Sequence, residues 1–341
     1  MITLRRCGQQ DGLKIGKNDM KNREFQMIKT NGIRLCTVVE GSGPLLILLH
    51  GFPQCWYLWR HQIDPLVAAG FQVAIPDQRG YGGSDKPTSI EAYNVVELSN
   101  DVAGLATALG HESFMVIGHD WGAPVAWHTA LLHPKRVRAV VGMSVPYVRL
   151  QIGAMTRQEN FGDNFWYMVY FQKPGIAETE LEADVRKTLR MVYYGVSGDA
   201  PEGLSLRPKP KSAKFLDGLI DPPVLPSWLT AADLEYYVTQ FEKSGFRGPL
   251  NWYRNIDRNI EITPQLDHAK IEQPAFFIAG KKDLVLSFAG GTLLPAMDSY
   301  VPNLRGKVLI EGAGHWVQAE RPSETSEALL GFLKSVALKS A

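Results

Sequence analysis

Three residues in this sequence have the chemistry of a nucleophile, an acid and a base, and each follows an apolar segment. Asp120 stands in "GHDWG", Asp283 in "GKKDLVL" and His315 in "GAGHW". A carboxylate can attack at neutral pH without first losing a proton, because its reference pKa is about 3.9. The chain order, nucleophile then acid then histidine, predicts covalent catalysis in which the second carboxylate orients the histidine.

Each of these residues also has a purely structural interpretation. Asp120 could cap the helix that follows it, Asp283 could be a turn residue, and His315 could be an ordinary loop histidine. Their combination favours catalysis, because all three follow buried segments in the order of a triad. Gly118 and Gly122 flank the first residue, and a sharp bend with a nucleophile at its tip leaves no space for side chains on either side.

Apolar segments predict the strands that must position these residues. Four segments are apolar almost throughout, as strands buried on both faces are: 44–50, 71–77, 113–119 and 137–145. Residues 25–30 and 33–40 partly alternate, like edge strands, and helical patterns such as 95–110 separate the buried segments. The alternation predicts an α/β fold with a mostly parallel sheet flanked by helices. Ligands bind at the carboxyl ends of the strands in such sheets.

The strand pattern stops after Pro146 and resumes at 274–280. In between, residues 172–195 have helical periodicity, 207–226 form a proline-rich loop, and Thr230 and Asp233 have the spacing of a capping box. A final amphipathic helix is expected from Pro322 to about Leu338. We therefore expect an N-terminal arm (1–24), a core made of 25–146 and 266–341, and an inserted all-helical cap (147–265).

The composition is that of an ordinary globular enzyme: 341 residues, 45% hydrophobic, 21% charged, with a formal net charge of +1. This balance gives no electrostatic reason to expect binding to nucleic acid or to an anionic membrane. No apolar run has the length of a signal peptide or a membrane span. We expect a cytoplasmic monomer or homodimer that needs no metal and no cofactor.

The segment "HGFP" (50–53) predicts a second part of the site. It follows a buried segment, so the backbone N–H of Phe52 is expected to pair with that of Trp121 as an oxyanion hole. Removing such a donor costs about 3–4 kcal/mol of transition-state stabilisation. A proline turn that ends a strand is the alternative interpretation, and the two are compatible.

Six motifs in order resemble those of the soluble epoxide hydrolases of the α/β-hydrolase fold. They are "HGFPQCWYLWR", "PDQRGYGGSDKP", "GHDWGAPVAW", "YFQKPGIAE", "SGFRGPLNWYRN" and "GHWVQAERP", within a similarity that runs from about residue 25 to 338. The resemblance implies a triad of Asp120, Asp283 and His315 in an enzyme that converts a small-molecule epoxide and water into a vicinal diol. It further implies substrate contacts by five residues: His50, Pro53, Trp121, Tyr253 and Trp316.

In that family two cap tyrosines donate hydrogen bonds to the epoxide oxygen. By motif position the matches here are Tyr167, three residues before the tyrosine of "YFQ", and Tyr253 of "NWYRN". Each could instead be a buried structural tyrosine, since the chain has 12 tyrosines. The nearby competitors are Tyr170, Tyr193, Tyr194, Tyr236 and Tyr237.

Other functions remain open from the sequence. A haloalkane or haloacid dehalogenase would use the same triad to displace halide. The haloalkane enzymes usually have asparagine where Phe52 stands, however, and the fluoroacetate type usually has arginine where Trp121 stands. A binding module without catalysis and a structural protein are the alternatives from other classes. Turnover of one epoxide would distinguish an enzyme from both.

Overall fold

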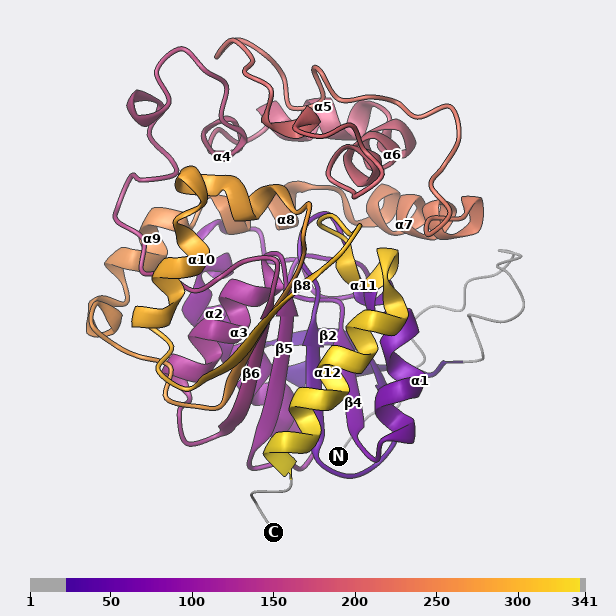
Figure 1. The fold of residues 1–341 in the computed structure, drawn as a ribbon, viewed down its shortest axis with the longest axis vertical. Helices are drawn as coiled ribbons and strands as arrows, with labels where there is room; N and C mark the ends of the chain where they lie inside the picture. The colour runs from indigo at the N-terminus through magenta and orange to yellow at the C-terminus, as the bar shows by residue number, and fades with distance from the viewer. Residues whose placement is uncertain (1–22, 338–341) are drawn as a thin grey trace.

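The computed structural model describes residues 23–337. The predicted arm (1–24) therefore lies almost entirely outside the described residues, and so does the end of the predicted last helix. Within the described part, an eight-stranded sheet is flanked by helices, and a helical segment lies above one end of it (Figure 1).

The sheet has the strand order β1-β2-β4-β3-β5-β6-β7-β8. The strands are β1 (Phe25–Thr30), β2 (Ile33–Glu40), β3 (Leu45–Leu49), β4 (Gln72–Pro76), β5 (Phe114–His119), β6 (Val137–Met143), β7 (Ala275–Gly280) and β8 (Leu304–Ile310). The β1–β2 and β2–β4 pairs are antiparallel and the other pairs are parallel. The predicted fold class is confirmed. The expectation that β2 is an edge strand is wrong, because β2 lies between β1 and β4.

The central strands are apolar because they are covered on both faces. Every residue of β3 and β5 is buried, as expected for parallel strands between helical layers. In register, Leu49 at the end of β3 pairs with Gly118, and Met143 at the end of β6 pairs with His119. The chain therefore leaves β3 and β5 at the same edge, which brings "HGFP" next to "GHDWG".

Helices of the core cover the sheet from opposite sides in Figure 1. They are α1 (Arg60–Ala68), α2 (Val95–Ala108), α3 (Gly122–Leu132) and α12 (Pro322–Ala337), and the short helices α10 (Leu293–Ala296) and α11 (Val317–Glu320) lie near the upper end of the sheet. Helix α1 packs against α12, and α2 packs against α3. Asn94 caps α2, since its side chain accepts from the backbone N–H of Val96 and Glu97.

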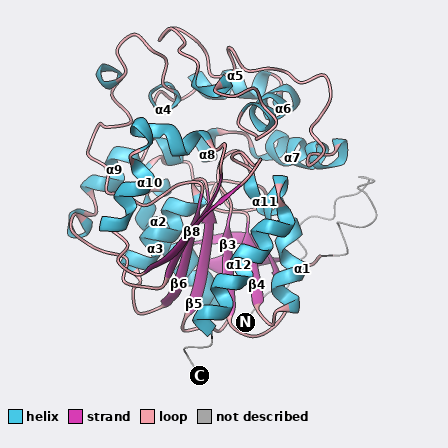
Figure 2. Cartoon of the chain, in the orientation of Figure 1, coloured by secondary structure: helices cyan, strands magenta, loops and turns pink. Residues whose placement is uncertain are grey.

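Between β6 and β7 the described chain forms helices and loops (Figure 2). The helices are α4 (Tyr167–Tyr170), α5 (Ile176–Ala183), α6 (Val185–Gly195), α7 (Ala231–Ser244), α8 (Arg247–Tyr253) and α9 (Ile256–Glu261). The capping box of Thr230 and Asp233 is confirmed at α7. Residues 172–195 form two helices, because Asp184 leaves helical geometry and accepts from the Lys187 N–H at 2.9 Å. The proline-rich stretch 207–226 is a loop with one isolated bridge, Asn164–Pro210.

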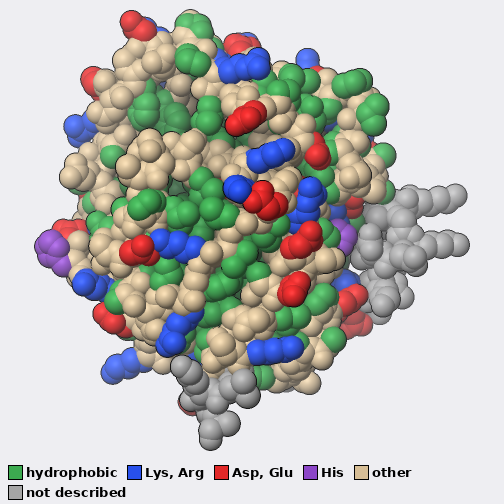
Figure 3. Space-filling model, in the orientation of Figure 1, with side chains coloured by type: hydrophobic (Ala, Val, Ile, Leu, Met, Phe, Trp, Pro, Cys, Tyr) green, Lys and Arg blue, Asp and Glu red, His purple; other side chains and the backbone are tan. Residues whose placement is uncertain are grey.

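The surface carries charges of both signs. Figure 3 shows Lys and Arg interspersed with Asp and Glu on the viewed face, so this face has no field of a single sign. Among residues 23–337, no helix combines the length and the apolar character that crossing a bilayer requires.

Candidate active site

Asp120 stands at the bend between β5 and α3 in a left-handed backbone conformation with φ of 52°. Asparagine and aspartate tolerate this region better than bulkier residues do. A Cβ on Gly118 would lie 1.9 Å from the Gly122 carbonyl oxygen, and a Cβ on Gly122 would lie 2.3 Å from the Leu49 carbonyl oxygen. Both neighbours are backbone and cannot move aside. The predicted lack of space on either side of the bend is confirmed.

The structure brings Asp120, Asp283 and His315 together from the ends of three strands. His315 Nε2 lies 3.4 Å from Asp120 Oδ2, and His315 Nδ1 lies 3.0 and 3.1 Å from the two Asp283 oxygens. Asp283 is also a turn residue, since its Oδ1 accepts from the Val285 N–H at 3.0 Å. Asp120 does not cap α3, whose N-cap is Trp121 with no side-chain cap bond. His315 therefore has a carboxylate on each side of its ring.

The backbone after β3 contacts the other oxygen of Asp120. The Phe52 N–H donates to Asp120 Oδ1 at 2.6 Å. A Cβ on Gly51 would lie 2.2 Å from that oxygen and 2.6 Å from the Trp121 nitrogen. Gly51 is thus required by close approach, and the Trp121 nitrogen, the second predicted donor, lies beside the same turn.

Tyr167 and Tyr253 enter the same place from the inserted helices. Tyr167 begins α4 and Tyr253 ends α8, with ring centroids 5.9 Å apart. Tyr253 also packs edge-on against Trp121, at 5.1 Å between centroids. Several competing tyrosines use their hydroxyls elsewhere. Tyr170 donates to Glu180, Tyr193 donates to the Pro53 carbonyl, and Tyr236 accepts from Trp56.

A cavity of about 170 Å³ joins these groups. Asp120, Trp121, Tyr167 and Tyr253 line it, and most of its remaining wall is apolar, including Pro124, Val145, Leu150, Met155, Ile256 and Ile260. His50, Pro53 and Trp316 are not among its lining residues. The His50 ring is buried, with Nε2 accepting from the Gln78 N–H at 3.0 Å, and Trp316 Nε1 donates to the Tyr193 carbonyl at 2.8 Å.

The charges of the site favour a negative Asp120 beside a positive His315. Burial raises the pKa of Asp120, but the hydrogen bond and charge of His315 outweigh it, so the pKa is lowered overall. Burial lowers the pKa of His315, but the charge of Asp283 and the bond to Asp120 reverse this and raise it. Burial and then the charge of Asp120 raise the pKa of Tyr167 and Tyr253. Both phenols therefore stay protonated at neutral pH.

Sequence reasoning missed Glu320, which holds the loop of His315. Its buried carboxylate accepts from the N–H groups of Gly314 (2.8 Å), Trp316 (2.9 Å) and Gly198 (2.8 Å). The His315 N–H donates to the Val196 carbonyl at 2.9 Å. The only sequence signal was a glutamate five residues after the histidine, because its third donor lies 122 positions away.

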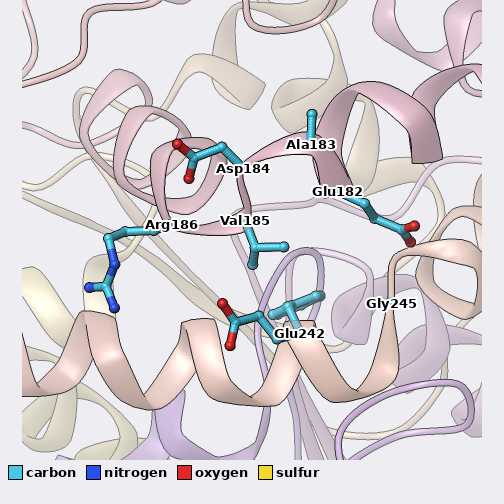
Figure 4. A pocket seen from close by; sticks show the side chains of 8 residues that line it. Glu182, Ala183, Asp184, Val185, Arg186, Glu242 and Gly245 are labelled. Carbon is cyan, nitrogen blue, oxygen red and sulfur yellow. The ribbon is translucent and has the colours of Figure 1, made fainter.

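A second pocket of about 530 Å³ lies between α7 and the junction of α5 and α6 (Figure 4). Two of its three acidic residues have structural partners: Glu182 accepts from the Phe246 N–H at 2.8 Å, and Asp184 caps α6. Arg186 pairs with Glu235. None of the residues predicted to act in catalysis lines this pocket, so its larger volume does not make it the site.

The chain matches the model of the alpha/beta hydrolase fold family over residues 44–322. It is 44% identical to epoxide hydrolase A of Mycobacterium tuberculosis, covering 92% of this chain and 98% of that protein. The crystal structure of epoxide hydrolase A from Mycobacterium thermoresistibile matches with a TM-score of 0.86 and 45% identity, over 92% of this chain and 98% of the other. An epoxide hydrolase from an endophytic Streptomyces matches with a TM-score of 0.89 and 40% identity, over 93% and 97%. The family predicted from the six motifs is confirmed: the chain belongs to the alpha/beta hydrolase fold family and, within it, to the epoxide hydrolases.

Proposed function

We propose that this enzyme hydrolyses epoxides to vicinal diols through an alkyl ester formed on Asp120. The observation that carries the proposal is a carboxylate and two protonated phenols lining one cavity, with a histidine 3.4 Å from that carboxylate. An epoxide has no carbonyl group to attack. Its saturated carbon must be displaced from behind the C–O bond, which requires a nucleophile on one side of the ring and an acid on the other.

In the first step, Asp120 Oδ2 forms a bond to one ring carbon while the C–O bond to the ring oxygen breaks. The electron pair stays on the oxygen, which takes a proton from Tyr167 or Tyr253. The raised pKa of both phenols keeps that proton available. Proton transfer of this kind contributes about 10²–10⁴-fold to the rate.

In the second step, His315 deprotonates a water that attacks the carbonyl carbon of the Asp120 ester. The ester has no negative charge, so one of the two carboxylates that raise the pKa of His315 is neutralised. The pKa of His315 therefore falls once the ester has formed, and the neutral imidazole can accept a proton from water. Asp283 stabilises the imidazolium that forms. The oxyanion lies where Phe52 N–H already donates at 2.6 Å, with Trp121 N–H as second donor. Collapse of the tetrahedral intermediate passes the remaining proton of the added water to the departing oxygen, releases the diol and restores the Asp120 carboxylate. The phenolate left by the first step takes up the proton that His315 gives up when the ester forms, and His315 regains a proton from the attacking water.

We further propose that residues 147–265 act as a cap on a core made of 25–146 and 266–341. The inserted segment supplies both phenols, whereas the core supplies Asp120, Asp283 and His315. Trp121 and Tyr253 contact the substrate directly in this proposal. His50, Pro53 and Trp316 act from behind the cavity wall; the Pro53 carbonyl, for example, accepts from Tyr193 at 2.7 Å.

A single-turnover experiment in ¹⁸O-enriched water tests the covalent mechanism. With enzyme in excess over a terminal epoxide, the first diol should lack the label, and the label should appear in the Asp120 carboxyl group. Full labelling of the first diol would show direct attack by water and contradict the proposal. A chloroalkane of equal length serves as the comparison, because halide release without diol formation would instead support a dehalogenase.

A further inference from the structure

The cavity at Asp120 extends along one face of α3. Pro124, Trp127 and His128 line it, at the three- and four-residue spacing of a single helix face. His128 lies six residues after Gly122, the first residue of α3, which corresponds to about 9 Å at the α-helical rise. Because Asp120 and His128 line the same cavity, a substrate whose epoxide lies at Asp120 would extend along this face toward His128.

His128 presents an acceptor in this cavity. Its Nδ1 lies 2.7 Å from the Pro124 carbonyl, and a carbonyl oxygen only accepts, so Nδ1 carries the hydrogen and Nε2 carries the lone pair. Burial lowers the pKa of His128 to about 4, so the ring is neutral at pH 7. The Tyr147 ring packs edge-on against it with centroids 5.8 Å apart. Within residues 23–337, Nε2 has no hydrogen-bond partner.

Asn259 presents a donor in the same cavity. It lies on α9 and is 9% exposed. Its Oδ1 accepts from the Val95 N–H at 2.8 Å, which fixes the amide orientation and leaves the NH₂ group free to donate. In the part of the chain that the structure describes, this nitrogen has no protein partner, and Asn259 lines the cavity.

The charges nearby are already paired. The Arg149 guanidinium also lines the cavity, but it donates to the Asp267 carboxylate at 2.7 Å and to Thr263 Oγ1 at 2.9 Å. The rest of this end is apolar, including Leu150 and Ile260. A carboxylate here would lose its hydration and face the lone pair of His128. A hydroxyl group can both donate and accept a hydrogen bond. It therefore matches the free acceptor of His128 and the free donor of Asn259.

We propose that His128 and Asn259 form a subsite for a neutral hydroxyl group at the remote end of an epoxide substrate. The hydroxyl donates to His128 Nε2 and accepts from the Asn259 amide nitrogen. This inference depends on the proposed epoxide hydrolysis for the position of the ring, but the subsite itself can be measured without turnover.

The test compares pairs of terminal epoxides of equal length that end in CH₂OH or CH₃, with about four to ten methylene groups to bracket the roughly 9 Å of helix. The measured quantity is the ratio of kcat/KM within a pair. At the best length, His128→Phe and Asn259→Asp should each lower the ratio about tenfold, because the hydroxyl is left without one partner. Asn259→Asp keeps an acceptor for the Val95 N–H, replaces the amide donor by a carboxylate oxygen and adds a negative charge. The control is His133→Phe, a histidine near the end of the same helix that does not line the cavity, and it should leave the ratio unchanged.

A ratio that stays at the wild-type value in both variants would overturn the proposal, and so would a preference for an ω-carboxylate over the hydroxyl at every length. Binding of 1-octanol, followed by the fluorescence of Trp121 and Trp127 in the cavity wall, separates this test from catalysis. Octanol affinity should fall about tenfold in His128→Phe but not in His133→Phe. If no epoxide is hydrolysed while this difference appears, the proposed function fails and the subsite stands.

Discussion

Removing the hydroxyl of Tyr253 should slow ring opening and leave ester hydrolysis nearly unchanged. The phenol is buried 5.9 Å from that of Tyr167, measured between ring centroids, and both face the cavity above Asp120. A hydrogen bond to a developing charge is worth about 1.5–3 kcal/mol. With one phenol remaining, Tyr253→Phe should therefore reduce the rate of ester formation by about 10- to 150-fold.

Both phenols are proposed to donate to the same epoxide oxygen, so the effects of removing each hydroxyl on the rate of ester formation should not be additive. Tyr167→Phe alone should resemble Tyr253→Phe, but the double variant should lose more than the product of the two, because no acid is left for the alkoxide. Tyr170→Phe is the matched control: it lies on the same helix as Tyr167, and its hydroxyl donates to Glu180 at 2.8 Å.

Stopped-flow tryptophan fluorescence measures both steps, since Trp121 packs against Tyr253 with centroids 5.1 Å apart. The fast phase reports ester formation and the slow phase reports its hydrolysis. Equal slowing of both phases in Tyr253→Phe would refute the role of this phenol as the ring-opening acid, because a general loss of packing would affect both.

Four further results are expected. Glu320→Gln should slow ester hydrolysis more than ester formation, because the amide cannot accept from Gly314, Trp316 and Gly198 together; stopped-flow phases measure this. Gly118→Ala should destabilise the fold by more than about 3 kcal/mol in urea unfolding, because its Cβ would lie 1.9 Å from a backbone oxygen. Ester formation should not vary from about pH 5 to 9, because the pKa of Asp120 is lowered and those of both phenols are raised. Ester hydrolysis should rise with pH as His315 loses its proton, and a fall with rising pH would contradict its role as base.

Much of the fold was predictable because the hydrophobic pattern of each segment agrees with its place in the folded sheet. The expected strands 25–30 and 33–40 match β1 and β2 residue for residue, and the glycines around Asp120 predicted a bend without space. The split between α5 and α6 was missed, because Asp184 sits in an otherwise continuous helical pattern.

The sequence predicted those site residues whose type alone determines their chemistry. It did not predict roles that depend on which way a side chain points in the folded protein. His50 follows a buried strand, as Asp283 does, but its ring turns inward to Gln78. The sequence around His128 is that of a buried helix, and only the packing of α9 and the 145–150 loop against α3 shows that this residue lines a cavity. Tyr167 and Tyr253 came from motif resemblance, since nothing in their local sequence separates them from the other tyrosines.

The most direct test of the central claim is the mass of the enzyme during turnover. In His315→Gln, which lacks the base for the second step, addition of an epoxide should increase the protein mass by one substrate, and fragmentation should locate the added mass on Asp120. Steady diol formation without any adduct, or an adduct on another residue, would contradict a covalent ester at this position.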